Sequence, residues 1–252
     1  MKIRFLGTGT STGIPQIGCK CEVCRSTDKK DKRLRTSAFF STYKTKILID
    51  CGPDFRQQIL KVPFAPLDAV LITHEHYDHV GGLDDLRSFS IFGNVQVYAE
   101  DYVCDRIRHR LPYCFVEKRY EGVPRIELNA ISSNESFNIG DINITPLRVL
   151  HGKLPILGYR LNEVGYITDM LSAPKETYEA LKGVKVLIVN ALREKFHHTH
   201  QTLSEALTFA KQINAERTYL IHMSHDMGIH SEVEKELAKN VFLAYDDLEI
   251  KF

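Results

Sequence analysis

The stretch LITHEHYDHVGG, residues 71–82, crowds three histidines and one aspartate into six positions directly after an apolar run. That run, DAVLIT at 68–73, is apolar and β-branched, and it predicts a buried strand that ends near Thr73. Gly81 and Gly82 then let the backbone fold tightly behind the polar side chains. The alternative is a solvated loop that happens to be rich in histidine. Histidine is an uncommon residue and this spacing is restrictive, so we favour a metal-binding turn.

Four side chains of this stretch have the spacing of metal ligands. His74 and His76 lie two apart at the end of the strand. Residues i and i+2 of an extended chain point the same way, so both imidazoles can reach one metal ion. Asp78 and His79 follow in the turn before the next helix, where they can bind a second metal ion. The stretch alone therefore predicts two neighbouring metal sites.

The composition is that of an ordinary globular protein. The chain has 252 residues and shows no linker or internal repeat, so we expect one α/β domain over residues 1–252. The formal net charge is +1, which gives no reason to expect a polyanion-binding field over the whole surface. No apolar stretch approaches the roughly 18–20 residues of a membrane-spanning helix, and the N-terminus lacks the features of a secretory signal. We therefore expect a cytoplasmic protein.

Strand-like runs dominate both halves of the chain, and helical patterns are interspersed. The predicted strands are 2–7, 37–42, 46–52, 68–74, 95–100, 142–150, 157–161, 165–169, 184–192 and 218–224. The predicted helices are 80–89, 202–213 and 231–240. The second has an apolar stripe at helical spacing, and Thr202 and Glu205 supply a capping box at its start. This pattern indicates two packed sheets with helices outside.

The histidine stretch is the signature H-x-H-x-D-H, and the sequence resembles the metallo-β-lactamase superfamily in this signature, in one landmark before it and in three after it. These follow in the family's order and span about residues 47–225: Asp50 in ILIDCG, His151 in VLHG, Asp169 in GYITD and His222 in LIHMSH. The resemblance implies an αββα sandwich, with the site at the loop-bearing edge between the two sheets.

The resemblance also implies a ligand set for two metal ions. His74, His76 and His151 would hold one ion, Asp78, His79 and His222 the other, and Asp169 would bridge them. Imidazole and carboxylate suit zinc, manganese or iron(II) better than calcium. Two such ions can lower the pKa of a bridging water from 15.7 towards about 7, which supplies hydroxide at neutral pH. Asp78 and Asp169 are thereby catalytic as well as ligating. Asp50 is not expected to contact a metal ion but to orient the side chains that do. Alternatively, Asp50 is a purely structural turn residue.

Three of the six cysteines lie close together, and they suggest a further metal site. Cys19, Cys21 and Cys24 have C-x-C-x2-C spacing in a loop at about residues 18–25, and three thiolates supply most of a tetrahedral structural zinc site. His225 is the candidate fourth ligand, because on a strand it would face away from His222, three residues earlier. Free buried thiols and a redox pair are the alternatives. A zinc ribbon is disfavoured because there is no second Cys-x2-Cys pair.

The cysteine spacing, the N-terminal GTG and the second histidine after His222 resemble one subgroup of the superfamily, which includes the phosphodiesterase of the carbon–phosphorus lyase pathway. That subgroup has a non-ligating histidine directly before a helix, which is His200 here. By this resemblance His200 protonates the leaving alkoxide or stabilises charge on the phosphate, and His197 supports it. The stretch CGPDFRQQIL, residues 51–60, also resembles the superfamily protein of pyrroloquinoline quinone biosynthesis.

These features together predict a hydrolase that uses two divalent metal ions, zinc or manganese with iron as an alternative, and one structural zinc. We expect a phosphodiesterase acting on small, including cyclic, phosphodiesters by attack of a metal-bridging hydroxide. Membrane partners are not expected, nor is nucleic acid beyond short or cyclic nucleotides, and a homodimer is left open. The alternatives are hydrolysis of a lactone, thioester or β-lactam, an iron-based oxidation or cofactor-maturation role, and a zinc-stabilised interaction module without activity.

Overall fold

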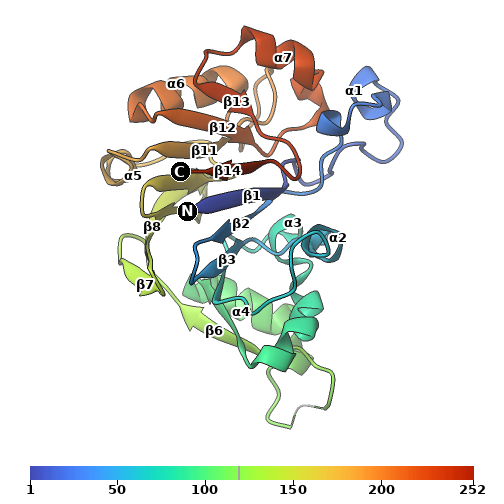
Figure 1. The fold of residues 1–252 in the computed structure, drawn as a ribbon, viewed down its shortest axis with the longest axis vertical. Coiled ribbons are helices and arrows are strands. Elements are labelled where there is room, and N and C mark those ends of the chain that lie inside the picture. Colours follow the sequence, from blue (N-terminus) through green and yellow to red (C-terminus); the bar gives the residue numbers. More distant parts are fainter. Residues whose placement is uncertain (119) are drawn as a thin grey trace.

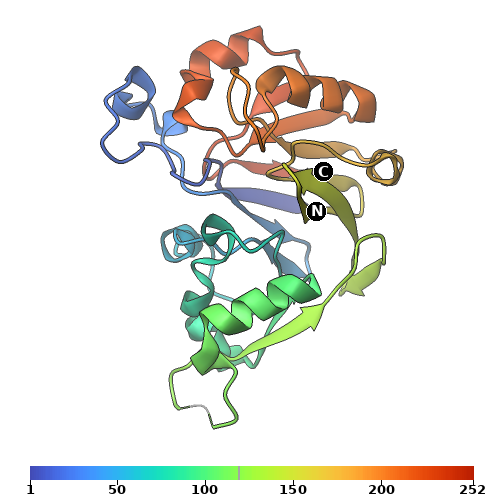
Figure 2. The same cartoon turned by 180° about the vertical axis from the view of Figure 1, so that it is seen from behind.

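Two mixed β-sheets face each other and helices cover their outer sides, as Figures 1 and 2 show from opposite directions. The structure is a computed structural model and describes residues 1–118 and 120–252. Within these residues each sheet has seven strands, in the orders β14-β1-β2-β3-β4-β5-β6 and β13-β12-β11-β10-β9-β8-β7. The predicted αββα sandwich of the metallo-β-lactamase fold is confirmed.

The first sheet contains β1 (Lys2–Gly7), β2 (Ser37–Ser41), β3 (Lys46–Ile49), β4 (Ala69–Leu71), β5 (Val95–Ala99), β6 (Ile126–Ala130) and β14 (Glu249–Lys251). The second contains β7 (Phe137–Ile139), β8 (Ile142–His151), β9 (Leu154–Leu161), β10 (Val164–Ile167), β11 (Val186–Asn190), β12 (Arg217–Ile221) and β13 (Val241–Leu243). The helices are α1 (Glu22–Arg25), α2 (Phe55–Ile59), α3 (Tyr77–Val80), α4 (Asp101–Arg110), α5 (Lys175–Ala180), α6 (Leu203–Ile213) and α7 (His230–Glu236). Shorter 3₁₀ segments include η2 (Leu83–Phe92) and η4 (His225–Met227).

The hydrophobic core has three layers because successive side chains of a central strand point to opposite faces of its sheet. On β3, Ile47 and Ile49 join the apolar cluster between the sheets, while Leu48 joins the cluster beneath the outer helices. A third cluster lies beneath α6 on the other side of the molecule. Full burial of each such side chain contributes about 1.5–3 kcal/mol. The continuous apolar runs recognised in the sequence are therefore the central strands, which are buried on both faces.

The helix predicted over 80–89 is not an α-helix. The segment forms the 3₁₀ helix η2, in which Leu83, Leu86 and Phe89 are all buried. Their spacing of exactly three residues matches the three residues per turn of a 3₁₀ helix and so places all of them on one face. By contrast, α6 begins at the expected place, and its capping box between Thr202 and Glu205 is confirmed.

The two ends of the chain lie side by side at the edge of the first sheet, where β1 pairs antiparallel with β14 (Figure 1). The amino group of Met1 donates a hydrogen bond to the carbonyl of Phe252 at 2.7 Å. Lys2 and Arg4 on β1 both form ion pairs with Glu249 on β14. Across the described residues, we find no helix with the length and apolarity needed to cross a membrane.

Candidate metal centre

Histidines and aspartates from both sheets meet at one edge of the sandwich, because each stands at or just after the carboxyl end of a strand. The first sheet supplies the segment after β4, and the second supplies residues at the ends of β8, β10 and β12. The first group whose ligand atoms lie within 4.8 Å of one another is His74, His76 and His151. The second is Asp78, His79, Asp169 and His222. Each group therefore draws ligands from both sheets.

In the second group, Asp169 contacts two of the histidines. Its two carboxylate oxygens lie 3.2 Å from Nε2 of His79 and 3.1 Å from Nε2 of His222. Asp78 and His79 were predicted in a turn before a helix, but they lie within the single-turn helix α3. The helix turns Asp78 and His79 towards the same group, and Asp78 Oδ2 is 3.1 Å from His79 Nε2.

The chemistry of the donor atoms fits divalent cations. The Nε2 atom of His74 is buried and has no hydrogen-bond partner in the described residues, whereas those of His79 and His222 each face a carboxylate oxygen at 3.1 Å. Leaving an atom like Nε2 of His74 unsatisfied costs about 1–3 kcal/mol. Burial, helped by His79, holds the pKa of His74 well below its usual value, so this imidazole keeps a free lone pair. Although burial raises the pKa of Asp169, His222 and His79 hold it well below its usual value. Imidazole nitrogens beside an anionic carboxylate form a cation-binding set.

Asp50 lies behind these groups and orients His79. Nδ1 of His79 donates to Oδ2 of Asp50 at 2.7 Å, and the backbone N–H of Thr73 donates to Oδ1 at 2.9 Å. With Nδ1 occupied, His79 directs Nε2 into the second group. A carboxylate in this position fixes both the tautomer and the ring orientation of a ligating histidine.

Three residues of the centre have a backbone conformation that is unusual for side chains other than glycine. The φ angles of Asp50, Asp169 and His222 are 60°, 56° and 57°. Left-handed conformations of this kind cost of order 1–3 kcal/mol and cluster at functional sites. Each occurs just after a strand has ended, where it turns the side chain away from the alternation of the sheet. Asn190 supports one of these turns, because its side-chain amide makes two hydrogen bonds to the backbone of Met170.

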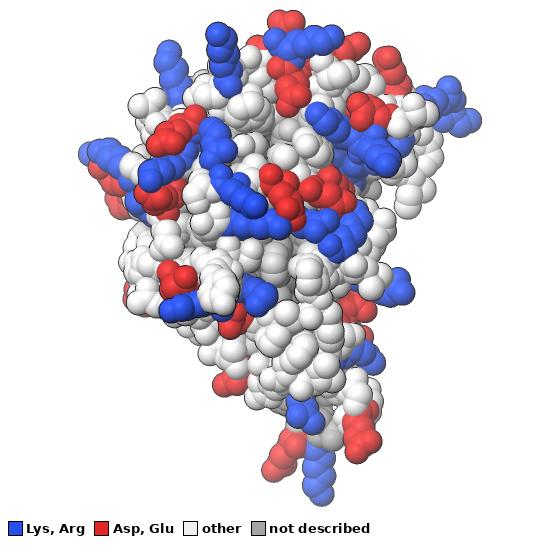
Figure 3. All heavy atoms as spheres, in the orientation of Figure 1, with Lys and Arg blue, Asp and Glu red and all other residues white. Residues whose placement is uncertain are grey.

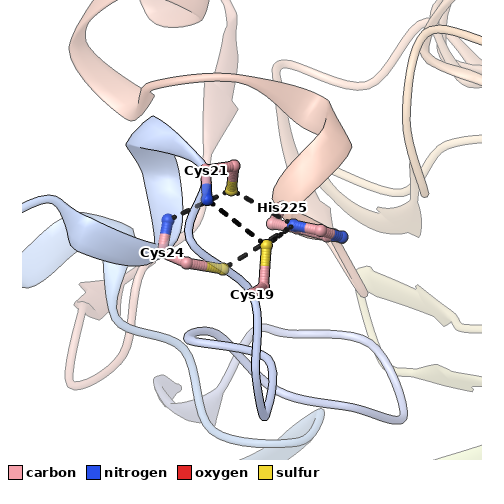
Figure 4. A group of neighbouring side chains, drawn as sticks. All are labelled: Cys19, Cys21, Cys24 and His225. Carbon is pink, nitrogen blue, oxygen red and sulfur yellow. Dashed lines mark hydrogen bonds between the residues drawn. The ribbon is translucent and has the colours of Figure 1, made fainter.

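The three cysteines of the N-terminal loop surround His225 (Figure 4). Nδ1 of His225 lies 3.1, 3.2 and 3.6 Å from the sulfur atoms of Cys19, Cys21 and Cys24. The strand geometry predicted for His222 and His225 is wrong, because β12 ends at Ile221 and His225 begins η4. The left-handed turn at His222 separates the directions of the two imidazoles instead.

The segment that precedes the cysteine loop is joined to the metal centre through the backbone. Thr10 donates its N–H to the carbonyl of Met223, and Met223 donates to the carbonyl of Thr8. The guanidinium of the buried Arg33 donates to Thr8 and contacts Nδ1 of His230 at 3.0 Å. Met223, the residue after His222, is therefore bound through both its N–H and its carbonyl to the N-terminal part of the chain.

His200 lies beside both groups. Its ring centre is 4.5 Å from that of His151 and 5.0 Å from that of His222, and its Nδ1 lies 3.7 Å from Asp169. Burial lowers the pKa of His200 to about 3, so the imidazole is neutral. The ring of His197 lies 5.1 Å from that of His200, whereas His198 is exposed.

Backbone contacts that the sequence does not reveal complete the arrangement. His151 donates Nδ1–H to the carbonyl of Thr199 at 3.0 Å, which orients Nε2 towards the first group. The loop that carries this carbonyl is fixed because Gln201 donates to the carbonyl of Met170 and accepts from the N–H of Leu192. No residue type marks a carbonyl that orients a ligand, so only the three histidines at 197, 198 and 200 pointed to this loop.

The sandwich and the converging histidines and aspartates define a metal-dependent hydrolase domain. The model of the β-lactamase superfamily domain matches residues 45–223. A crystal structure described as a new diphosphatase from the PhnP family is 36% identical, with a TM-score of 0.93, and the match covers 100% of this chain and 96% of that one. The chain belongs to the PhnP family of the metallo-β-lactamase superfamily.

Two further relatives support different conclusions about this chain, one about its sequence relationship and one about its fold alone. An octanoyltransferase of Porphyromonas gingivalis is 47% identical over 251 residues, which are 99% of this chain and 51% of that protein. The chain thus spans about half the length of this curated relative. The zinc-bound PqqB of Methylobacterium extorquens has a TM-score of 0.77 and 18% identity, with 100% of both chains covered. At that identity the likeness shows the fold alone.

Proposed function

We propose that this protein is a phosphodiesterase that hydrolyses small, including cyclic, phosphodiesters with two divalent metal ions. The observation that carries the proposal is the pair of ligand groups that share one edge of the fold, with Asp169 between them and His200 beside both. The PhnP-family diphosphatase, similar over the whole chain, favours phosphorus over carbon as the centre attacked.

The ligand set divides between the two ions. His74, His76 and His151 would hold one, Asp78, His79 and His222 the other, and Asp169 would contact both. We propose zinc or manganese, with iron as the alternative, because imidazole and carboxylate suit these ions. When bound, two such ions lower the pKa of water towards about 7 and neutralise negative charge on a phosphoryl group.

His200 would act on the substrate rather than on a metal ion. Because burial keeps its imidazole neutral, an N–H of the ring can donate a hydrogen bond to a phosphoryl or leaving oxygen as negative charge develops there. Of the two roles expected from the sequence, this favours charge stabilisation over proton transfer. Asp50 and the Thr199 carbonyl would keep the ligating rings in place while the substrate binds and leaves.

One panel of substrates tests this function. The protein, loaded with manganese or zinc, is offered a bis-aryl phosphate, 2′,3′-cyclic nucleotides, a dinucleoside diphosphate, a lactone and a chromogenic β-lactam. We expect turnover of the phosphorus substrates, and a chelator should abolish it. Hydrolysis confined to the lactone or the β-lactam would overturn the proposal.

A second candidate function is hydrolysis of an acyl thioester. It is favoured by one observation, the octanoyltransferase name of the relative that is 47% identical. That protein is about twice as long as the matched region, and the other half of it can carry the named activity. An octanoyl thioester added to the same panel separates the two candidates, because the first predicts no turnover of it.

We further propose that Cys19, Cys21, Cys24 and His225 hold a structural zinc ion. Cys21→Ser is expected to remove one zinc ion per chain, because serine is a poor zinc ligand. The binding free energy of a structural zinc ion contributes to folding, so Tm should fall by about 5–15 °C, which corresponds to about 2–5 kcal/mol for a chain of this size. Metal analysis and thermal denaturation measure both effects.

The matched control for Cys21→Ser is Cys104→Ser, which changes a buried cysteine outside the cluster. It should keep the full zinc content even where it lowers Tm. If Cys21→Ser kept both its zinc and its Tm, the cysteine loop would be held by its backbone contacts alone and the zinc site would be disproved.

A further inference from the structure

A cavity of about 540 Å³ lies between the N-terminal part of the chain and the segment that joins β13 to β14. We call it the lysine cavity, after Lys29, Lys30 and Lys32 in its wall. Its volume is in the range of small-molecule sites. None of the described residues that line it belongs to the metal centre or to the cysteine cluster. The lysine cavity is therefore a separate candidate binding site.

Cationic side chains outnumber carboxylates in the lysine cavity. The cations are Lys29, Lys30, Lys32, Arg33 and Lys61, and the carboxylates are Asp246 and Asp247. In the orientation of Figure 1, lysine and arginine side chains gather on the surface between α1 and the edge formed by β1 and β14 (Figure 3). An excess of positive charge in a hollow focuses the electrostatic field and raises the local concentration of anions.

Three of these lysines have no carboxylate partner within the described residues. The side chain of Lys29 makes no hydrogen bond or ion pair there. The ammonium group of Lys30 lies 4.7 Å from the ring centre of Tyr245, and that of Lys32 donates to the carbonyl of Cys24 at 3.0 Å. Each of the three ammonium groups therefore keeps its charge available for an anionic ligand.

The other charges of the lysine cavity already have partners. The buried Arg33 donates to the hydroxyl of Thr8, which in turn donates to the carboxylate of Asp246 at 2.8 Å. Burial lowers the pKa of Arg33 to about 10 and raises that of Asp246 to about 6, so both groups are charged at neutral pH. Asp247 is paired with Lys61 at 2.6 Å. These opposite charges offset one another, and the three lysines determine which ligand is attracted.

Apolar side chains complete the wall of the lysine cavity. They are Ile14, Pro15, Leu34 and the half-buried ring of Tyr245. Aromatic side chains in such a wall can stack on a flat ring of any base, whereas ammonium groups bind phosphate. The wall therefore fits a ligand that carries both a flat ring and more than one anionic group.

We propose that the lysine cavity binds a nucleoside diphosphate, with its phosphates on Lys29, Lys30 and Lys32 and its base against the apolar wall. A purely anionic ligand such as inorganic pyrophosphate would leave the apolar wall uncovered. A purely apolar ligand would leave the three ammonium groups without a partner.

Isothermal titration calorimetry of the metal-loaded protein with α,β-methylene-ADP tests the proposal, because this analogue cannot be hydrolysed between its phosphates. The double variant Lys29→Glu/Lys30→Glu should weaken binding in the lysine cavity about tenfold or more, since it places two carboxylates against the phosphates. Any binding of the analogue at the metal centre is common to both proteins. The wild type should therefore bind one more molecule per chain than the variant.

Lys211→Glu/Lys239→Glu is the matched control, because both lysines are exposed, lie outside the lysine cavity and give the same change in net charge. It should bind the analogue as the wild type does. Circular dichroism and metal analysis show that each variant is folded and keeps its metal ions. If Lys29→Glu/Lys30→Glu is not folded, Lys29→Glu alone decides, with an expected loss of about threefold or more.

Two results would overturn the proposal. The first is a wild-type protein that binds no more of the analogue than Lys29→Glu/Lys30→Glu does. The second is inorganic pyrophosphate that binds in the lysine cavity as tightly as the analogue, because the base would then contribute nothing. We expect adenosine and pyrophosphate each to bind there at least about tenfold more weakly, since each makes only part of the contacts.

Discussion

Asp169→Asn is expected to abolish phosphodiester hydrolysis and to lower the active-site metal content from two ions to one or none. The carboxylate is central to the second ligand group and also lies within reach of His151 and His200. Asparagine keeps the shape but removes the charge and one oxygen acceptor. Removing a single oxyanion donor costs about 10²–10³ in kcat. Because Asp169 would contact both ions, the loss should exceed about 10³-fold.

Metal analysis of the purified variant, together with kcat for a bis-aryl phosphate, measures this prediction. The matched control is Asp105→Asn on α4, where the exposed carboxylate pairs with Arg108. That variant should keep both its metal content and its activity. An Asp169→Asn protein with two metal ions and undiminished turnover would show that Asp169 does not connect the two groups.

His200→Ala is expected to keep both metal ions while kcat falls by about 10²–10³-fold. The ring packs against His151 and His222, but it takes no part in the two compact ligand groups. Its loss therefore removes a hydrogen-bond donor to the substrate and leaves the ligands in place. KM should change much less than kcat, because the donor acts on charge that develops during the reaction.

His198→Ala is the control for this second prediction, since His198 is an exposed histidine in the same loop. It should behave as the wild type. The geometry also allows His200 to be a metal ligand, because the ligand atoms of His151, Asp169 and His200 lie within 4.8 Å of one another. If His200→Ala lost a metal ion, His200 would be a ligand and the proposed role in charge stabilisation would be wrong.

The sequence predicted the central strands well because burial on both faces makes them continuous apolar runs. Each of the ten predicted strands corresponds to an observed one, whereas β6, β7, β13 and β14 were missed. Three of the missed strands have only three residues, too few for a period of two to stand out. The helix α4 was missed because its sequence is mostly charged, and only Val103, Cys104 and Ile107 are buried. Its position depends on the sheet against which it packs.

The residue types of the candidate site could be predicted, but much of its geometry could not. The histidine signature could be recognised in the sequence because all of its members lie in one short segment. The directions of His222 and His225 depend on where β12 ends and on a left-handed turn, neither of which leaves a mark in residue type. The Thr199 carbonyl that orients His151 could not be predicted either, since every residue carries a backbone carbonyl.

The pairing of β1 with β14 also has a consequence during synthesis. A ribosome makes β1 well before β14, so one edge of β1 stays unpaired until the residues between the two strands have emerged. An open edge is a template for aggregation between nascent chains. Lys2 and Arg4 protect this edge in the meantime, because charged side chains along an unpaired strand discourage a second chain from adding to it.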